Sequence, residues 1–256
     1  MKKGCLSSNA LKMIAMSAML LDHVGVKIIY QTYLKACVVE GVHMMGETIP
    51  AEAKRWYLCY LVLRSIGRIA FPVFAYLLVE GFLHTKNWMN YAKRLFLFAV
   101  VSEAAYDLPW SSDSLLSQNV LWTFLIGLVM LYHLRQDEWL EGRAKLQRII
   151  RDVLAGMLAA FLIQSDYSAM GILFIAVLYL LRENKWKQAA AGCAVLGFMT
   201  VEAAVFSPEM WIQIFSIFSF GLLHFYNGER GRGNKYVFYV FYPLHLMILG
   251  LIARAS

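Results

Sequence analysis

The sequence predicts an all-α fold, a polytopic integral membrane helix bundle, because its composition is too apolar for one soluble core and its apolar residues form repeated long runs. Of the 256 residues, 60% are hydrophobic and 16% are charged, whereas an average soluble domain has about 45–50% apolar and about 25% charged residues. This excess argues against a soluble globular enzyme. The 14% of aromatic residues excludes disorder, because such a chain has ample apolar surface to bury.

Long apolar segments recur along the whole chain. A helix that crosses a hydrocarbon core of about 30 Å needs about 20 mostly apolar residues. About nine segments fit this description, namely 10–32, 57–82, 92–109, 118–134, 150–165, 168–182, 187–206, 209–226 and 235–253. Nearly every residue lies in or beside one of them and no repeat is evident, so we expect one domain over residues 1–256.

The basic residues between these segments predict the orientation. Loops rich in Lys and Arg stay on the cytoplasmic side of a membrane. With the N-terminus inside, the outer side collects only a few basic residues, Lys27, Lys35, Lys54, Arg55 and Arg254. We therefore expect a cytoplasmic N-terminus and an external C-terminus. The basic surplus is spread over several loops rather than gathered on one face, so nucleic acid is not an expected partner.

Ionisable residues inside the first two segments are the strongest functional signal. A charge at mid-bilayer costs about 2.5–3.5 kcal/mol on insertion scales, so it usually faces a partner or a cavity. At 1.5 Å per residue, Asp22 and His23 lie about 20 Å from the cytoplasmic end of their helix, and Arg64 and Arg68 lie roughly 10–16 Å below the outer surface. The four groups are expected at similar depth, with both arginines on one helix face.

Their roles follow from helix geometry. Adjacent residues on a helix do not face each other, so we expect Asp22 to neutralise one of the arginines rather than to pair with His23. His23 is then free to act as a base or an acyl acceptor. The alternative is a purely structural buried ion pair with a satisfied histidine. Pro72 removes the hydrogen bond to the Arg68 carbonyl and predicts a kink there.

Further polar residues within the apolar segments could line a cavity. Glu103, Tyr106 and Asp107 fall on one face of the third segment, and Asn119 lies on one face of the fourth. These side chains could line a polar cavity, but pairing with one another for structural reasons explains them equally well. In the last segment, a kink at Pro243 accompanies a histidine that is either a cavity ligand or a partner in a helix–helix hydrogen bond. The candidate substrate-binding residues are Glu103, Tyr106, Asp107, Asn119, Tyr242 and His245.

A glycine-rich basic segment, 226–235, joins the last two apolar segments on the expected cytoplasmic side. Its three glycines permit close backbone approach and its cations can hold phosphates. The alternative is a solvated loop that only obeys the positive-inside rule.

Several in-order motifs resemble the TraX family over nearly the whole chain. They are Leu11–Met16, Leu21–Gly25, Gly67–Tyr76, Asn119–Thr123, Tyr226–Gly231 and Tyr242–His245. TraX proteins are known for N-terminal acetylation of pilin subunits in conjugative bacteria. The first-span histidine followed by a second-span arginine before a Phe-Pro stretch is also similar, more distantly, to membrane acyltransferases that acetylate envelope sugars and to the lysosomal heparan glucosaminide acetyltransferase.

The resemblance implies an acyltransferase in the bacterial cytoplasmic (inner) membrane that moves an acetyl group from cytosolic acetyl-CoA to an amine or hydroxyl acceptor. The acceptor is a pilin-like peptide, a glycan or a small molecule. Pilin itself is not assigned to this chain as the acceptor, because the outer segment 34–56 matches no family motif. The partners expected are acetyl-CoA, this acceptor and the lipid bilayer, and no metal is expected.

On this hypothesis the expected catalytic residues are His23, Asp22, Arg64 and Arg68. The nucleotide of acetyl-CoA is held at the cytoplasmic mouth, and the expected cofactor-binding residues are Lys93, Arg94, Tyr226, Asn227, Arg230, Arg232 and Lys235. Two alternatives remain. One is a small proton-coupled transporter that uses the buried ionisable groups as a relay, against which no matching interrupted spans are seen. The other is a non-catalytic membrane scaffold.

Overall fold

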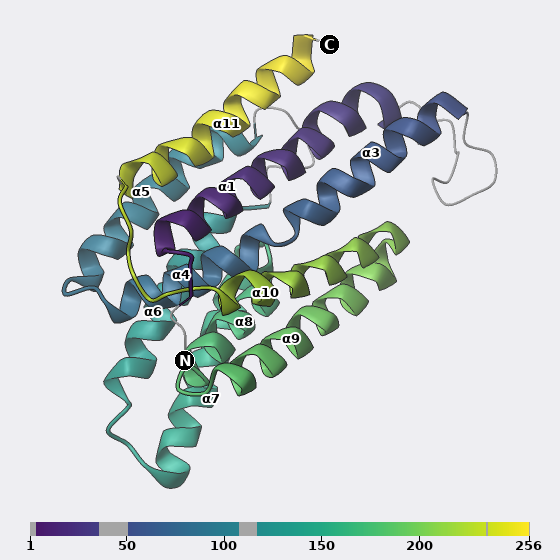
Figure 1. The fold of residues 1–256 in the computed structure, drawn as a ribbon. Coiled ribbons are helices and arrows are strands. Elements are labelled where there is room, and N and C mark those ends of the chain that lie inside the picture. Colours follow the sequence, from purple (N-terminus) through teal and green to yellow (C-terminus); the bar gives the residue numbers. More distant parts are fainter. Residues whose placement is uncertain (1–3, 36–50, 108–116, 234, 256) are drawn as a thin grey trace. The chain divides into compact units, whose positions relative to one another are not determined.

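A computed structural model describes residues 4–35, 51–107, 117–233 and 235–255, and this part of the chain is helical with no strands (Figure 1). In chain order the elements are α1 (Ser8–Val24), the π-helix η1 (Gly25–Leu34), α3 (Ala51–Gly67), α4 (Ala70–Leu83), α5 (Trp88–Asp107), α6 (Val120–Gln136), α7 (Gly142–Leu162), α8 (Ser168–Leu180), α9 (Lys185–Phe206), the 3₁₀-helix η3 (Pro208–Phe218), α10 (Ser219–His224) and α11 (Lys235–Ala255).

The helices form two compact units. Unit 1 comprises residues 1–74 and 196–256, and unit 2 comprises residues 75–195. In unit 1, α1 and η1 pack against α3 and α11, and η3 packs against α3. In unit 2, α6 packs against α5, α7 and α8. The expectation of a single domain over 1–256 stays a prediction.

Four helical segments of the described chain are long and apolar enough to cross a membrane. They are Ser8–Leu34, Ala53–Leu83, Lys185–Val205 and Tyr236–Arg254. Shorter apolar helices cover Val120–Gln136, Ser168–Leu180 and Met210–His224. Large apolar side chains stay exposed along α7 and α11, for example Leu158, Phe161 and Leu251. Exposed apolar faces of this extent belong against lipid, so the chain is a membrane protein.

All nine segments expected from the sequence fall on helices of the described chain. The number of membrane crossings stays a prediction, as does the side on which the N-terminus lies. The second helix begins at Ala51, earlier than the expected residue 57, so the end of the segment placed in an outer loop is helical. Residues 36–50 of that loop lie outside the described residues.

The second segment is interrupted close to the point where a kink is predicted. Helix α3 ends at Gly67 and α4 begins at Ala70, with turns between them. Pro72 has no amide hydrogen to donate to the carbonyl of Arg68, so one hydrogen bond of the α-helical ladder is missing here. The interruption leaves Arg68 at the end of α3.

Candidate active site

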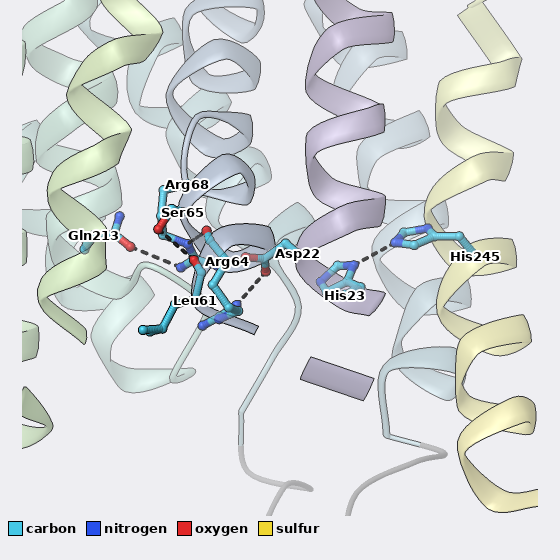
Figure 2. A network of polar contacts seen from close by, with 8 residues as sticks. All are labelled: Asp22, His23, Leu61, Arg64, Ser65, Arg68, Gln213 and His245. Carbon is cyan, nitrogen blue, oxygen red and sulfur yellow. Dashed lines mark hydrogen bonds and ion pairs between the residues drawn. The ribbon is translucent and has the colours of Figure 1, made fainter. Parts of the chain in front are cut away.

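One carboxylate of α1 binds two arginines of the second segment. The Nη1 of Arg64 donates to Oδ2 of Asp22 at 2.6 Å, and the Nη2 of Arg68 donates to Oδ1 of the same carboxylate. Figure 2 shows the two guanidinium groups converging on Asp22. All three residues are buried, with exposed fractions of 7%, 8% and 9% for Asp22, Arg64 and Arg68. The prediction that Asp22 neutralises an arginine is confirmed, and one net positive charge remains in the cluster.

Two glycines let the helices approach closely enough for these bonds. A Cβ added at Gly67 would collide with the Cβ, Cγ and Oδ1 atoms of Asp22. A Cβ added at Gly25 would lie 3.4 Å from the Cβ of Leu63 and 3.7 Å from the Cγ of Arg64. The carboxylate therefore occupies the space that a side chain at position 67 would fill.

The two arginines differ in how fully they are bonded. The Nε of Arg68 donates to the carbonyl of Arg64 at 3.3 Å, and its Nη1 donates to Oε1 of Gln213 on η3 at 3.1 Å. The Nε of Arg64 is buried and has no hydrogen-bond partner in the described part of the chain. Arg68 is thus fixed in place by its neighbours, whereas Arg64 keeps a buried donor for another group.

His23 lies next to Asp22 in the sequence but points away from the arginines, toward α11 (Figure 2). Its Nδ1 lies 2.7 Å from the Nε2 of His245, and the two rings stack with centroids 5.0 Å apart. His245 is buried, with 4% exposed, and His23 is half-buried. The structure shows a helix–helix hydrogen bond of His245, and a role as a cavity ligand stays a prediction.

The Phe241 carbonyl sets the proton positions in this pair. It lies 2.8 Å from the Nδ1 of His245, and because a carbonyl only accepts, that nitrogen donates. With both rings neutral, the Nε2 of His245 then accepts and the Nδ1 of His23 donates, since each neutral imidazole has one donor and one acceptor nitrogen. The Nε2 of His23 is left with a lone pair for a base or a nucleophile.

The chain changes from an α-helix to a π-helix directly after this site. Helix η1 runs from Gly25 to Leu34. π-Helical turns are rare in proteins as a whole, and those that occur frequently lie at functional sites. Helix η1 buries Lys27, which is 2% exposed. The helix continues past Lys27 and packs it inside unit 1, and the expectation that it lies on the outer side stays a prediction.

In unit 2, Glu103 and Asn119 are hydrogen-bonded to each other. Glu103 accepts from the backbone and the side-chain amide of Asn119, and its Oε2 accepts from the Nε1 of Trp122 at 2.9 Å. Asn119 also caps α6, because its Oδ1 accepts from the Leu121 amide at 3.0 Å. The structure therefore shows structural pairing of these two residues, and their lining of a cavity stays a prediction.

The contacts of the remaining candidates do not assign a substrate. Substrate binding by Glu103, Tyr106, Asn119, Tyr242 and His245 stays a prediction, and the side chain of Asp107 lies outside the described part.

The basic segment 226–235 is fastened to the start of α1. The Ser8 amide donates to the Glu229 carbonyl at 2.8 Å and the Asn9 amide donates to the Arg230 carbonyl at 3.1 Å. A further pair of backbone bonds joins Leu6 to residues 225 and 227. The loop is therefore held by main-chain bonds, and the side chains of Arg230 and Arg232 stay exposed.

The expected nucleotide-binding residues divide between the two units. In unit 1, Tyr226 is buried, Asn227 is half-buried, and Arg230 and Arg232 are exposed. The side chain of Lys235 lies outside the described part. In unit 2, Lys93 is exposed, and the guanidinium of Arg94 lies 5.8 Å from the centre of the Tyr91 ring. Nucleotide binding by these residues stays a prediction.

Sequence reasoning missed the polar residues of η3. Gln213 holds Arg68, and Ser216 and Ser219 follow it at intervals of three residues. Residues three apart are neighbours in both a 3₁₀-helix and an α-helix, so the interval alone does not reveal the 3₁₀ geometry.

Comparison with known proteins gives the family. The family model described as "TraX protein" matches residues 7–253. The chain is similar to a protein described as the probable fimbrial assembly protein FimC, serogroup H1, of Dichelobacter nodosus. The two are 27% identical over 208 residues, which cover 74% of this chain and 82% of that protein. No solved structure matches the chain. Since the family model covers nearly its whole length, the chain belongs to the TraX family.

Proposed function

We propose that this protein is a membrane-embedded acetyltransferase of the bacterial inner membrane. It moves an acetyl group from cytosolic acetyl-CoA to an amine or hydroxyl acceptor at the membrane or its outer face. The observation that supports this best is that a base follows a buried cationic cluster in the sequence: the Nε2 of His23 keeps a lone pair, and the preceding residue, Asp22, belongs to a cluster with one net positive charge.

The donor enters from the side of the basic loop. The phosphates of acetyl-CoA are polyanionic, and the exposed guanidinium groups of Arg230 and Arg232 suit them because charge-assisted hydrogen bonds to phosphate are strong. The backbone bonds between the loop and α1 hold these arginines at the end of the helix that carries His23. This arrangement brings the thioester arm toward His23.

In the direct route, His23 acts as a general base. Its Nε2 takes the proton of the acceptor N–H or O–H while the acceptor atom bonds to the thioester carbonyl carbon. The resulting tetrahedral intermediate then breaks its C–S bond, and His23 returns the proton to the leaving thiolate. The products are the acetylated acceptor and free coenzyme A.

In the covalent route, Nε2 attacks the thioester first. The C–S bond breaks, the thiolate leaves and takes up a proton, and an acetyl-histidine forms. The acceptor then attacks the acetyl group, loses its proton and regenerates His23. Both routes use the same lone pair and have the same overall balance.

Arg64 is the better candidate to stabilise the oxyanion. Its buried Nε has no partner in the described chain, whereas the nitrogens of Arg68 hold Asp22, Gln213 and the Arg64 carbonyl. A preorganised donor in a low-dielectric site is worth about 2.7–4 kcal/mol in comparable oxyanion sites. Arg68 then serves to position Arg64 and Asp22.

The acceptor class rests on family membership. The relative from Dichelobacter nodosus is described as a fimbrial assembly protein, which makes a role in processing pilus subunits the first to test. A free amine at the start of such a subunit is one acceptor that the chemistry of His23 suits, and a glycan hydroxyl is another.

Donor binding tests the proposal without knowledge of the acceptor. Acetyl-CoA should raise the thermal midpoint of the purified protein with saturation, because a ligand that binds only the folded state stabilises it by about 2.7 kcal/mol at one hundred times its Kd. Arg230→Gln combined with Arg232→Gln should weaken this effect. Arg254→Gln, which removes a charge at the other end of α11, should leave it unchanged. No midpoint shift at millimolar acetyl-CoA would contradict the proposal.

A further inference from the structure

Helix η3 has an unusual geometry for its length. It is a 3₁₀-helix of 11 residues, Pro208–Phe218, within unit 1. Runs of 3₁₀-helix longer than three or four residues are uncommon, because their hydrogen-bond geometry is poorer than that of an α-helix. A long run therefore needs a reason, and its side-chain alignment supplies one.

The 3₁₀ geometry aligns three polar side chains. With three residues per turn, positions i, i+3 and i+6 lie directly above one another. Gln213, Ser216 and the C-cap residue Ser219 have this spacing, with exposed fractions of 6%, 0% and 0%. They form a buried polar row, here called the η3 stripe, about 12 Å long at 2.0 Å per residue.

Each residue of the η3 stripe has a polar atom without a hydrogen-bond partner in the described chain. These atoms are the Nε2 of Gln213 and the Oγ atoms of Ser216 and Ser219. Leaving a buried polar group unpaired is destabilising, and most such groups in folded proteins are paired. Three in one aligned row indicate a site for a ligand that supplies the missing partners.

The η3 stripe leads from the acid–arginine cluster, formed by Asp22, Arg64 and Arg68, toward the basic loop, residues 226–235. At one end, Oε1 of Gln213 accepts from Arg68 at 3.1 Å. Figure 2 shows Gln213 directed at Arg68 from the neighbouring helix. At the other end, Ser219 begins α10, and the chain then reaches Tyr226 and the loop that is fastened to the start of α1. The row thus links the two places where the proposed function puts the thioester and the nucleotide.

We propose that the η3 stripe binds the amide groups of the pantetheine arm of acetyl-CoA. This inference rests on the proposed function. The arm is uncharged and carries two secondary amides and a hydroxyl, whose donors and acceptors complement a carboxamide N–H and serine hydroxyls. The stripe itself has no charged residue, so it suits the arm rather than the phosphates. Its direction, from loop to arginines, matches the donor rather than an acceptor arriving from outside.

Two ligands separate the arm from the nucleotide. Coenzyme A carries the arm, and 3′-phospho-ADP has the same phosphates without it. For Ser216→Ala combined with Ser219→Ala, calorimetry on protein in lipid nanodiscs should give about ten-fold weaker binding of coenzyme A, since each neutral hydrogen bond is worth about three- to ten-fold. Binding of 3′-phospho-ADP should not change.

The thermal midpoint of the ligand-free protein gives a second readout. If the two serines had a purely structural role, their removal would lower this midpoint. Removing unpaired buried hydroxyls should leave the thermal midpoint of the ligand-free protein unchanged or raise it. The control is Ser102→Ala in unit 2, because Ser102 is also fully buried with an unpartnered Oγ. This control should bind coenzyme A as the parent does.

Three results would overturn the inference. Unchanged coenzyme A affinity in the double variant would remove the stripe from the donor site and leave the proposed function standing. A weaker apparent affinity for the acceptor alone would assign the stripe to the acceptor. If the parent protein binds neither coenzyme A nor 3′-phospho-ADP, the donor assignment itself fails and the inference fails with it.

Discussion

The lone pair on the Nε2 of His23 depends on a carbonyl on another helix. The Phe241 carbonyl fixes the proton on His245, and His245 in turn fixes the proton on His23. In the proposed mechanism, His245 therefore acts through His23 and is a positioning residue rather than a catalytic one. Its role is to select the tautomer and hold the ring.

Substitution of His245 tests this role. His245→Leu removes the acceptor for the Nδ1–H of His23 and should lower kcat about 10²-fold, the low end of what a positioned base contributes, with little change in the KM for the donor. His245→Gln should restore part of kcat, because its carbonyl can accept the same hydrogen bond. A steady-state kcat and KM comparison checks this. Equal losses in the Leu and Gln variants would contradict it.

Asp22 has a structural role that can be measured separately. Asp22→Asn leaves two buried guanidinium groups without a carboxylate, and breaking a buried ion pair from one side costs about 3–5 kcal/mol. We expect a loss of unfolding free energy of that size in detergent-based denaturation. Asp137→Asn is the matched control, because Asp137 pairs with a half-exposed Arg151 at 3.5 Å and should cost about 1 kcal/mol or less. Similar losses in both variants would be evidence against the buried cluster.

At the scale of elements, the apolar pattern was sufficient for most helices. Each of the nine expected segments coincides with helix, and the break after Gly67 lies close to the kink predicted from Pro72. The pairing of Asp22 with arginine was also predictable, because a buried carboxylate needs a cation and helix geometry excludes its neighbour as a partner.

The π- and 3₁₀-helices were not predictable in the same way. Both are apolar segments whose composition fits an α-helix, and their hydrogen-bond pattern depends on tertiary packing. As a result, the burial of Lys27 in η1 and the aligned polar row of η3 were missed. The partner of His23 was missed as well, because His23 and His245 are far apart in the sequence and only packing brings them together.

The connection between α6 and α7 is stabilised by a carboxylate whose effect depends on pH. Glu138 accepts from the Tyr179 hydroxyl at 2.6 Å and from Arg182 at 2.7 Å. Partial burial alone would raise the pKa of Glu138, but these hydrogen bonds and the Arg182 charge outweigh it and lower the pKa below its usual value of 4.5.

A lowered folded-state pKa means that Glu138 stabilises the protein above pH 4.5, and that this contribution is lost as pH falls through the folded-state pKa. Glu138→Gln should therefore lower the thermal midpoint near neutral pH, and the difference from the parent should vanish in acid. Glu183→Gln is the control, because Glu183 is 88% exposed and lies 3.5 Å from the same arginine. A difference that persists unchanged in acid would rule out this origin.

At the scale of the whole molecule, the family match spans residues 7–253 and so includes both units. The acid–arginine cluster, the histidine pair and the η3 stripe all lie within unit 1, although their residues run from position 22 to position 245. The N-terminal residues and the loop before α11 are joined by main-chain bonds. This contact couples the start of the chain to the proposed donor site.

The contact can be disturbed with a matched pair of glycine variants. A Cβ at Gly231 would collide with the Oγ and Cβ of Ser7, whereas nothing lies within 4 Å of a Cβ at Gly228. Both glycines have positive φ, +70° and +79°, so Gly231→Ala and Gly228→Ala carry the same kind of backbone strain. Only Gly231→Ala should weaken coenzyme A binding, by about five-fold or about 1 kcal/mol. Calorimetric Kd values check this, and equal effects would show that the contact with Ser7 does not matter.

The most direct test of the account is transfer of a labelled acetyl group. Purified protein in nanodiscs is given acetyl-labelled acetyl-CoA with pilin-derived peptides or glycans, and both free thiol release and labelled acceptor are measured. The parent and His84→Ala, which changes an exposed histidine, should form both products. His23→Ala, shown to be folded, should lose at least about 10²-fold in rate. Transfer by His23→Ala at the parent rate would contradict the account.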